Sequence, residues 1–354
     1  MAQPNIVNHT PFVVEPLFFY DERNVPIVTV AVKASCEIVG THHLRFSEQQ
    51  APLCLAGEYW GAPETASYKY EPEAVPLKLT TDVVLVGHAV PEKEGDSAVK
   101  VGVKVGPVSK IVQVFGDRHW DKVGDTFQPT PPQPIERIPL NYEHAFGGRD
   151  PRVPEGESQY MSTSNPVGKG YMTPGQDCLV GMPLPNLEDP RHLIQSWRDQ
   201  PSPAGVGFIS PHWLPRTPLA GTYDEEWQRT RAPLYPLDFD RRFFNAGSPG
   251  LVTAEYLSGG EDVVVINASE RGALRFALPG LAAPRCKLSF HDANHVEMEC
   301  RLDTLIINTD EHQVYLIWRA YAVVPEGHQH VAGVSLWLPR VDVLAGQRLS
   351  KGEG

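Results

Sequence analysis

Side chains able to do acid–base chemistry gather in a short segment directly after a predicted strand, Gly116-Asp117-Arg118-His119-Trp120. Asp and His at a strand end can transfer protons or bind a metal ion. A metal site needs a third and a fourth ligand, and no nearby His or carboxylate motif has the spacing to supply them. We therefore favour a structural interpretation, in which Asp117 pairs with Arg118 or His119 to fix the turn and Trp120 packs beneath it.

A second segment, residues 134–148, places Glu143 and His144 shortly before Gly147 and Gly148. A carboxylate and an imidazole beside two glycines are compatible with a mobile active-site loop. The HExxH spacing of zinc hydrolases is absent, however, and a double glycine serves equally well in a tight turn. Both interpretations stay open at this point.

The third segment, Asn165-Pro166-Val167-Gly168-Lys169-Gly170-Tyr171, surrounds a lysine with glycines. It resembles a phosphate-binding loop only loosely, because the GxxxxGK[ST] spacing that cradles phosphates is missing. We predict no nucleotide site there.

The fourth segment covers residues 221–227 and 237–245 and is rich in carboxylates. Paired carboxylates hydrolyse glycosides only when they face one cleft at a suitable separation. Caps on a short helix and an Arg–Asp network are the favoured interpretation. The chain also has no GxSxG motif and no cysteine in a recognised nucleophile setting, so we predict no catalytic residue, no cofactor and no metal site.

The composition narrows the class of protein. The chain has 354 residues, of which 41% are hydrophobic and 21% charged, as in globular proteins. A formal net charge of -12 argues against nucleic acid as the main partner, because phosphate binding needs a basic face. No apolar run approaches the roughly 20 residues that cross a bilayer, and the first residues lack the pattern of a secretory signal. We therefore predict a cytoplasmic protein that does not contact membranes.

The five cysteines suggest neither a disulfide framework nor a zinc ribbon, since their number is odd and no CxxC pair occurs. Cys36 falls on the apolar face of a predicted strand and is expected to be a buried thiol.

The elements that must position these segments are mostly strands. Residues 28–38 alternate apolar and polar side chains, which predicts a half-buried strand. Residues 99–105 and 111–115, separated by Gly106-Pro107, predict a hairpin. Further apolar runs predict strands at residues 83–86, 263–266, 305–307 and 314–318. Residues 81–87 and 261–267 also resemble each other, either as duplicated modules or as two ordinary buried strands.

The middle of the chain differs in composition from the rest. More than half of the 34 prolines lie in residues 129–236, which excludes long regular elements there. Two short helices are still expected. One is capped by Asp189 and runs to residue 198; the other starts with a Thr222–Glu225 capping box and stops before Pro233. Because the stretch keeps many aromatic residues, we expect an ordered segment that wraps over β structure.

The predicted fold is mainly β, with two antiparallel β modules, sandwich or barrel-like, joined by an ordered Pro-rich segment with two short helices. The boundaries are residues 1–128 for the N-terminal β module, 129–245 for the wrapping segment and 246–354 for the C-terminal β module.

A succession of motifs runs along nearly the whole chain: residues 12–21, 116–120, 134–148, 165–171, 184–190, 203–216, 220–245 and 302–310. This succession resembles a bacterial family catalogued as a domain of unknown function, whose genes often lie beside type VI secretion spike and effector genes. The resemblance implies an adaptor or chaperone that helps load a secreted effector protein onto the spike protein. It carries over no catalytic residue.

Trp, Tyr and Arg dominate binding hot spots, and an acidic surface accelerates capture of a basic partner, so the residues agree with a protein-binding role. The alternatives are a hydrolase that uses Asp117, His119, Glu143 or His144, and a structural component of the secretion apparatus. If the aromatic residues form the interface, Trp213 and Trp227 belong to it, whereas Trp120 is expected in the core. The candidate partner-binding or family-hallmark residues are Asp117, Arg118, His119, Trp120, Glu143, Phe146, Gly147, Gly148, Asn165, Pro166, Gly168, Tyr171, Trp213, Tyr223, Asp224, Trp227, Asp238, Arg242, Phe243 and Asn245.

Overall fold

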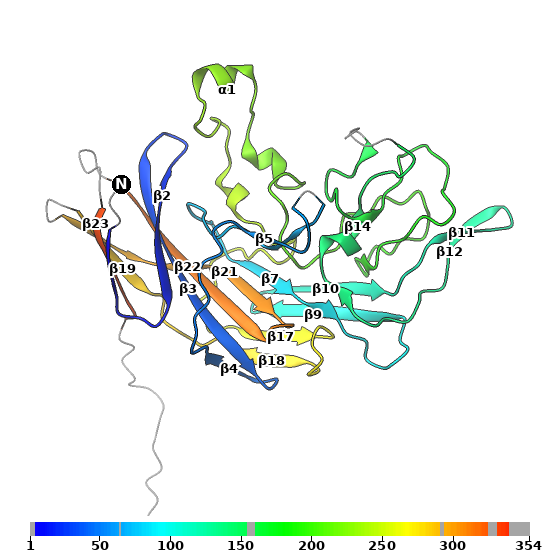
Figure 1. The fold of residues 1–354 in the computed structure, drawn as a ribbon, viewed down its shortest axis with the longest axis horizontal. Coiled ribbons are helices and arrows are strands. Elements are labelled where there is room, and N and C mark those ends of the chain that lie inside the picture. The colour runs from blue at the N-terminus through cyan, green and yellow to red at the C-terminus, as the bar shows by residue number, and fades with distance from the viewer. Residues whose placement is uncertain (1–3, 64, 154–159, 291–293, 325–330, 340–354) are drawn as a thin grey trace, which may run out of the picture.

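A computed structural model describes residues 4–63, 65–153, 160–290, 294–324 and 331–339 of the chain. The described part is mainly β, as the alternation of apolar residues predicts (Figure 1). Three sheets of four or more strands form the body, and a narrow arm that carries helix α1 projects from it (Figure 1).

The six-stranded sheet joins the two ends of the chain. Its strands are β2 (Val13–Tyr20), β3 (Pro26–Val39), β22 (Gln313–Val323), β21 (Arg301–Asn308) and β7 (Asp82–Val86), in this order, with β4 (His43–Phe46) paired to β3. Neighbouring strands are antiparallel except β7 and β21, which are parallel.

Strand β3 is buried on both faces, so the prediction of a half-buried strand is wrong for its polar face. Val30, Val32 and Cys36 are fully buried, but Thr29 and Lys33 on the opposite face are buried as well. The segment after β4 covers this second face: the Oγ1 of Thr29 donates to the carbonyl of Pro76, and Lys33 pairs with Glu73 at 2.7 Å. The predicted burial of the Cys36 thiol is confirmed.

The five-stranded sheet has the antiparallel order β16 (Leu187–Glu188), β10 (Val108–Phe115), β9 (Ala98–Val105), β17 (Asp262–Ile266) and β18 (Leu274–Ala277). The predicted hairpin is confirmed as β9 and β10. The two similar segments around residues 83–86 and 263–266 lie in different sheets with different neighbours, which fits two ordinary buried strands.

The four-stranded sheet has the order β1 (Asn5–Asn8), β23 (Val331–Trp337), β19 (Arg285–Phe290) and β20 (His295–Glu299), with β1 parallel to β23. Four short pairs complete the strands: β5 (Glu58–Tyr59) with β6 (Tyr68–Tyr70), β8 (His88–Ala89) with β13 (Ile138–Pro139), β11 (Trp120–Val123) with β12 (Thr126–Pro129), and β14 (Phe146–Gly147) with β15 (Lys169–Gly170).

The predicted arrangement of two separate β modules is not confirmed. Strands from both ends of the chain pair within the six-stranded and the five-stranded sheets, and one hydrophobic core includes Val30 of β3, Val103 of β9 and Leu288 of β19. Over the residues described, no large sheet closes into a barrel. The boundaries at residues 128/129 and 245/246 stay predictions.

The helix predicted at residues 189–198 is wrong, since these residues form turns. The Asp189 carboxylate accepts hydrogen bonds from the backbone and guanidinium of Arg191, so it closes a single turn. The second predicted helix exists as α1 (Glu225–Thr230), the one α-helix within the described ranges. Its N-cap is Asp224 rather than Thr222, and short 3-10 turns occur at η1 (Tyr142–His144), η3 (Thr217–Ala220) and η4 (Arg241–Phe244).

Asp82 at the start of β7 is a buried charge that joins three segments. Its carboxylate pairs with the Lys78 ammonium at 2.7 Å and accepts hydrogen bonds from the Asn245 side chain and the Ala246 backbone. Both charged side chains are almost completely buried. A buried ion pair that loses one member leaves the other charge uncompensated.

We expect Asp82→Ala to lower the free energy of unfolding by about 3–5 kcal/mol, because it strands the Lys78 ammonium in the core. Urea denaturation followed by tryptophan fluorescence measures the loss. Glu37→Gln, which breaks the exposed pair with Arg45, serves as the control and should leave the midpoint unchanged. Equal midpoints for the Asp82 variant and the unmodified protein would contradict the buried pairing.

Candidate functional site

Four motifs that lie far apart in the sequence meet in one region beside the five-stranded sheet. Strand β14 pairs in parallel with β15, which joins residues 146–147 to residues 169–170. Strand β16 pairs with the end of β10, next to the segment that begins at Gly116. The segments 116–120, 141–148, 165–171 and 184–188 therefore form one unit, which we call the motif cluster.

Asn165 ties the motif cluster together. Its side chain is fully buried, and its amide donates to the carbonyls of Tyr142 at 2.7 Å and Phe146 at 3.0 Å. The backbone of Gly148 donates to the Asn165 carbonyl at 2.7 Å. These bonds satisfy carbonyl groups that no regular ladder covers.

The double glycine allows two backbone segments to approach closely. Gly148 has φ +84°, and a Cβ there would lie 2.2 Å from the carbonyl oxygen of Gly168. A Cβ at Gly147 would lie 2.2 Å from the Asn165 oxygen. Of the two interpretations left open by the sequence, close packing therefore explains Gly147 and Gly148 better than a mobile loop.

Several candidate residues of the motif cluster make contacts within the fold that indicate a structural role. Trp120 and Phe146 are buried together with Met172, Met182 and Leu184, as expected for Trp120. Tyr171 packs at the edge of this group, and Pro166 is half-buried. Arg118 pairs with the buried Glu188 at 2.5 Å and lies 3.9 Å from the centre of the Phe115 ring, so its guanidinium is used within the fold.

The proposed acid–base residues separate into two groups. Glu143 accepts hydrogen bonds from the Ser67 backbone and hydroxyl at 2.7 and 2.6 Å, and His119 is exposed at the surface. Asp117 and His144 do lie near each other, because Asn186 donates its side chain to the Asp117 carboxylate at 3.0 Å and its backbone to the His144 carbonyl at 2.8 Å.

Lys169 completes a small polar group with Asp117 and His144. Its ammonium is 3.7 Å from the Asp117 carboxylate, which also accepts a hydrogen bond from Asn186 at 3.0 Å and has a lowered pKa. Burial and the charge of Lys169 lower the pKa of His144 to about 4, so its imidazole is neutral at pH 7. The neutral ring donates from Nδ1 to the Asn141 side chain at 2.6 Å. The cavities described below are lined by other residues.

The described residues hold no group of three or more His, Cys, Asp or Glu side chains arranged to bind a metal ion. The helix in the described ranges is too short and too polar to span a membrane.

The remaining candidate residues, except Trp213, belong to the arm, which we define as residues 214–245. Asp224 caps α1 by accepting a hydrogen bond from the Trp227 backbone at 2.8 Å. The Trp227 indole donates to the Leu234 carbonyl at 2.8 Å and packs against Tyr223 with ring centres 4.6 Å apart. Asp238 accepts two hydrogen bonds from Thr222, which explains why Thr222 is not the helix cap. The tip of the arm is thus held by its own side chains.

The base of the arm is fixed to the body. The Asn245 amide donates to the Thr80 carbonyl and to Asp82, and the buried Arg216 pairs with Glu71 at 2.5 Å. Arg216 also lies over the Phe243 ring. Arg242 pairs with Asp240 on the surface. Trp213, just before the arm, is buried against Tyr142, so it belongs to the core and is not available as a contact.

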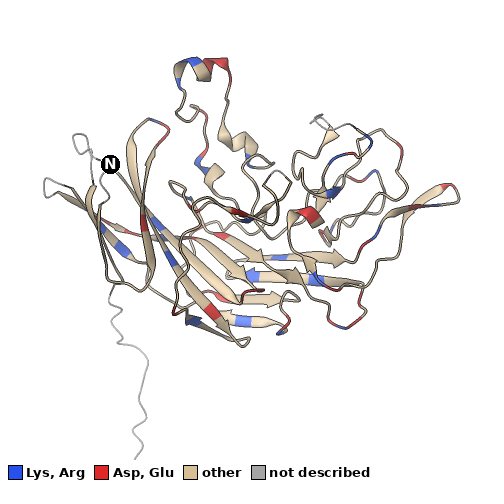
Figure 2. Ribbon diagram, viewed as in Figure 1, with Lys and Arg blue, Asp and Glu red and all other residues tan. Residues whose placement is uncertain are grey.

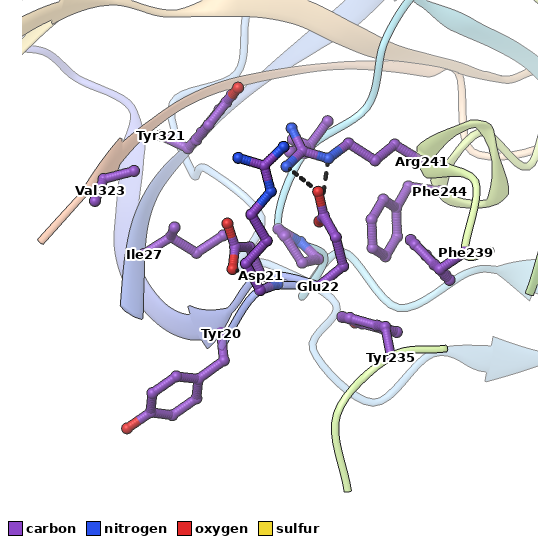
Figure 3. A pocket seen from close by; sticks show the side chains of 13 residues that line it. Tyr20, Asp21, Glu22, Ile27, Tyr235, Phe239, Arg241, Phe244, Tyr321 and Val323 are labelled. Carbon is purple, nitrogen blue, oxygen red and sulfur yellow. Dashed lines mark hydrogen bonds and ion pairs between the residues drawn. The ribbon is translucent and has the colours of Figure 1, made fainter. Parts of the chain in front are cut away.

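A cavity of about 360 Å³ lies between the arm and the tip of the β2–β3 hairpin (Figure 3). Tyr235 and Phe239 of the arm face Tyr321 and Val323 of β22 across it. The Arg241 guanidinium pairs with the Glu22 carboxylate at 2.7 Å, and Arg231 donates to the Glu22 carbonyl at 2.5 Å. The hairpin tip therefore holds the arm from the side.

Sequence reasoning missed this cavity and the role of Glu22. No local pattern connects the segment from Asp21 to Asn24 with Arg231 or Arg241, which follow more than 200 residues later. Several apolar residues around the arm are exposed, and Tyr223 alone among them was a candidate residue. They are Leu237, exposed to 84%, with Tyr20, Tyr223, Tyr321 and Val323, each exposed to about half.

The comparison with protein families settles the classification. A family model described as "Uncharacterized protein conserved in bacteria (DUF2169)" matches residues 23–319, which include the motif cluster and the arm. The chain belongs to this family. No curated protein and no solved structure matches it.

We expect Gly148→Ala to lower the free energy of unfolding by more than 2 kcal/mol, because its Cβ adds a collision with the Gly168 backbone to the cost of a positive φ. Gly124→Ala is the matched control, since φ is +62° there and no atom lies within 4 Å of the added Cβ. The control should lose about 1 kcal/mol. Equal losses in urea denaturation would show that close packing at Gly148 is unimportant.

A second prediction concerns the imidazole of His144. Because its pKa is lowered to about 4, the ring should stay neutral at pH 6, with the proton on Nδ1, in a two-dimensional ¹⁵N–¹H spectrum of the imidazoles. The stability linked to this group should be complete above pH 6.5 and fall as the pH decreases towards 4. A half-protonated His144 at pH 6 would contradict its burial beside Lys169.

Proposed function

We propose that the protein is an adaptor that binds a secreted effector and helps load it onto the spike protein of a type VI secretion apparatus, acting in the cytoplasm. The motif succession suggests this role, and the arm is the observation that supports it best. The arm projects from the body, and its own side chains hold it in place. Apolar side chains on such a segment lose less entropy on binding a protein than the same side chains on a flexible loop.

The chemistry of the arm fits a protein interface. Leu237 and Tyr223 are exposed, while Trp227 and Asp224 hold the backbone that presents them. Pre-organised side chains lose little entropy on binding, and tyrosine is enriched among hot spots. Acidic and basic residues are interspersed over the ribbon (Figure 2), and the formal net charge of -12 favours fast association with a basic effector.

A hydrolase remains the second candidate because Asp117 and His144 lie near each other in the motif cluster. Glu143 and His119 do not join them, since Glu143 binds Ser67 and His119 is exposed. We favour the adaptor, because the arm offers a formed contact surface whereas the polar group lines none of the cavities described.

The test is co-purification of a type VI secretion effector and a spike protein with a tagged form of the protein. We expect Leu237→Asp to weaken the complex by about 30-fold, since a carboxylate replaces the most exposed apolar side chain of the arm. Leu55→Asp, which changes an exposed leucine outside the arm, should bind like the unmodified protein.

His144→Gln separates the two candidate functions. An adaptor should retain effector binding and secretion with this substitution. Full binding by Leu237→Asp, or loss of secretion in His144→Gln while the complex stays intact, would overturn the proposal.

A further inference from the structure

One edge of the five-stranded sheet is only partly covered. Strand β16 pairs with Gln113 and Val114 of β10, and the chain then turns away at Asp189–His192. Pro190 cannot donate a ladder hydrogen bond, so the pairing has no means of continuing along β10. Residues 108–112 of β10 keep β9 on one side and no strand of the described chain on the other.

The backbone groups that face this open edge can be identified from the ladder. In an antiparallel pair, alternate residues direct their N–H and C=O groups towards the same neighbour. Phe115 donates to the carbonyl of residue 186 on the β16 side. Ile111 and Ser109, four and six residues earlier, therefore direct their backbone groups to the same side, beyond the end of β16.

A large cavity lies along this edge. Its volume is about 830 Å³, within the usual range of ligand sites. Ser109, Lys110 and Ile111 line one side, the turn at residues 189–192 closes one end, and Pro201, Pro203 and Pro249 contribute rigid apolar walls.

Lys110 gives this cavity a positive charge. In the ladder it lies opposite Val103 and two residues from Val112, both buried, so its side chain is on the apolar face of the sheet. An edge lysine that merely prevents aggregation carries its charge into water. Here burial lowers the pKa of Lys110 to about 8, with Arg191 acting in the same direction and Asp189 in the opposite one.

No carboxylate in the described part of the chain forms an ion pair with Lys110. Asp189 is the acidic residue of the lining, and its carboxylate accepts hydrogen bonds from the guanidinium and the backbone of Arg191. His192 adds a further basic group at the rim. The cavity thus combines an open strand edge, apolar walls and an ammonium group without an ion-pair partner among the described residues, in a protein that is acidic as a whole.

We propose that this cavity binds an extended, acidic peptide segment of a partner protein, which pairs with the free edge of β10 and places a carboxylate at Lys110. Main-chain hydrogen bonds to Ile111 and Ser109 supply the pairing, and the lysine selects acidic side chains. This site is distinct from the arm and does not depend on the proposed adaptor role.

The probe is a fluorescein-labelled octapeptide of alternating valine and glutamate, with the same peptide carrying lysine in place of glutamate as the comparison. Fluorescence anisotropy should show binding of the acidic peptide alone. Lys110→Met, which keeps the apolar stem, should weaken binding by about tenfold or more. Lys104→Met, on the neighbouring strand β9 and exposed, is the matched control and should bind normally.

Ile111→Pro tests the strand pairing separately. It removes one N–H on the open side of β10 and should abolish binding, while β9 keeps its own hydrogen bonds. Circular dichroism checks that each variant is folded, and Lys110→Met decides the outcome if the proline variant is not.

The affinity of the acidic peptide should also fall as the pH rises from about 7 through 8, because Lys110 loses its charge there. Lys110→Met should lack this dependence. Absence of binding to the unmodified protein, equal binding of the lysine peptide, or unchanged affinity in Lys110→Met would each overturn the proposal.

Discussion

The antiparallel pairing of β3 with β22 is the constraint on which the rest of the molecule depends. It joins residues 27–37 to residues 313–323 along the full length of β22, and both strands are buried on the two faces of the sheet except at the C-terminal end of β22. The chain that follows β3 must therefore leave this sheet and return to it at β22. Strands β7 and β21 extend the same sheet, and the hairpin β9–β10 forms the next one with β17.

The pairing of β3 with β22 holds both ends of the chain between them. Loops within that chain are then shorter closures and lose less entropy when they form. The proline-rich segment therefore keeps fixed positions although its prolines cannot form ladder hydrogen bonds. Asparagine side chains replace part of that ladder. The side chains of Asn165, Asn186 and Asn245 each donate to a backbone carbonyl of a distant segment, at Phe146, Phe115 and Thr80 respectively. The motif cluster and the base of the arm owe their shape to these amides.

Local patterns predicted the strands well, because apolar alternation reflects the period of the β-strand itself. Local patterns failed where a residue distant in the sequence determines the burial or the role of a side chain. Lys33 reads as an exposed residue, but Glu73 neutralises it under a covering segment. Asp189 reads as a helix cap, but Arg191 captures its carboxylate in a turn. Trp213 reads as a contact residue and is buried against Tyr142.

The same limit applies to the candidate sites. Asp117 and His144 come from different motifs. Asn186, from a third motif, donates hydrogen bonds to both, and the pairing of β14 with β15 brings Lys169 beside them. The arm was recognisable from its aromatic residues and helix cap, whereas its attachment to Glu22 depends on the folded hairpin. The free edge of β10 is visible only once β16 is known to be two residues long.

The separation of β3 and β22 in the sequence has a consequence during translation. Some 270 residues lie between the end of β3 and the start of β22, so at about 5–20 residues per second the ribosome needs roughly 15–55 s to deliver the partner strand. Throughout this interval the valine-rich edge of β3 has β2 and β4 as its nearest neighbours but lacks the strand that finally covers it. Nascent chains of this protein are therefore exposed to intermolecular β pairing for longer than chains whose neighbouring strands follow each other in sequence.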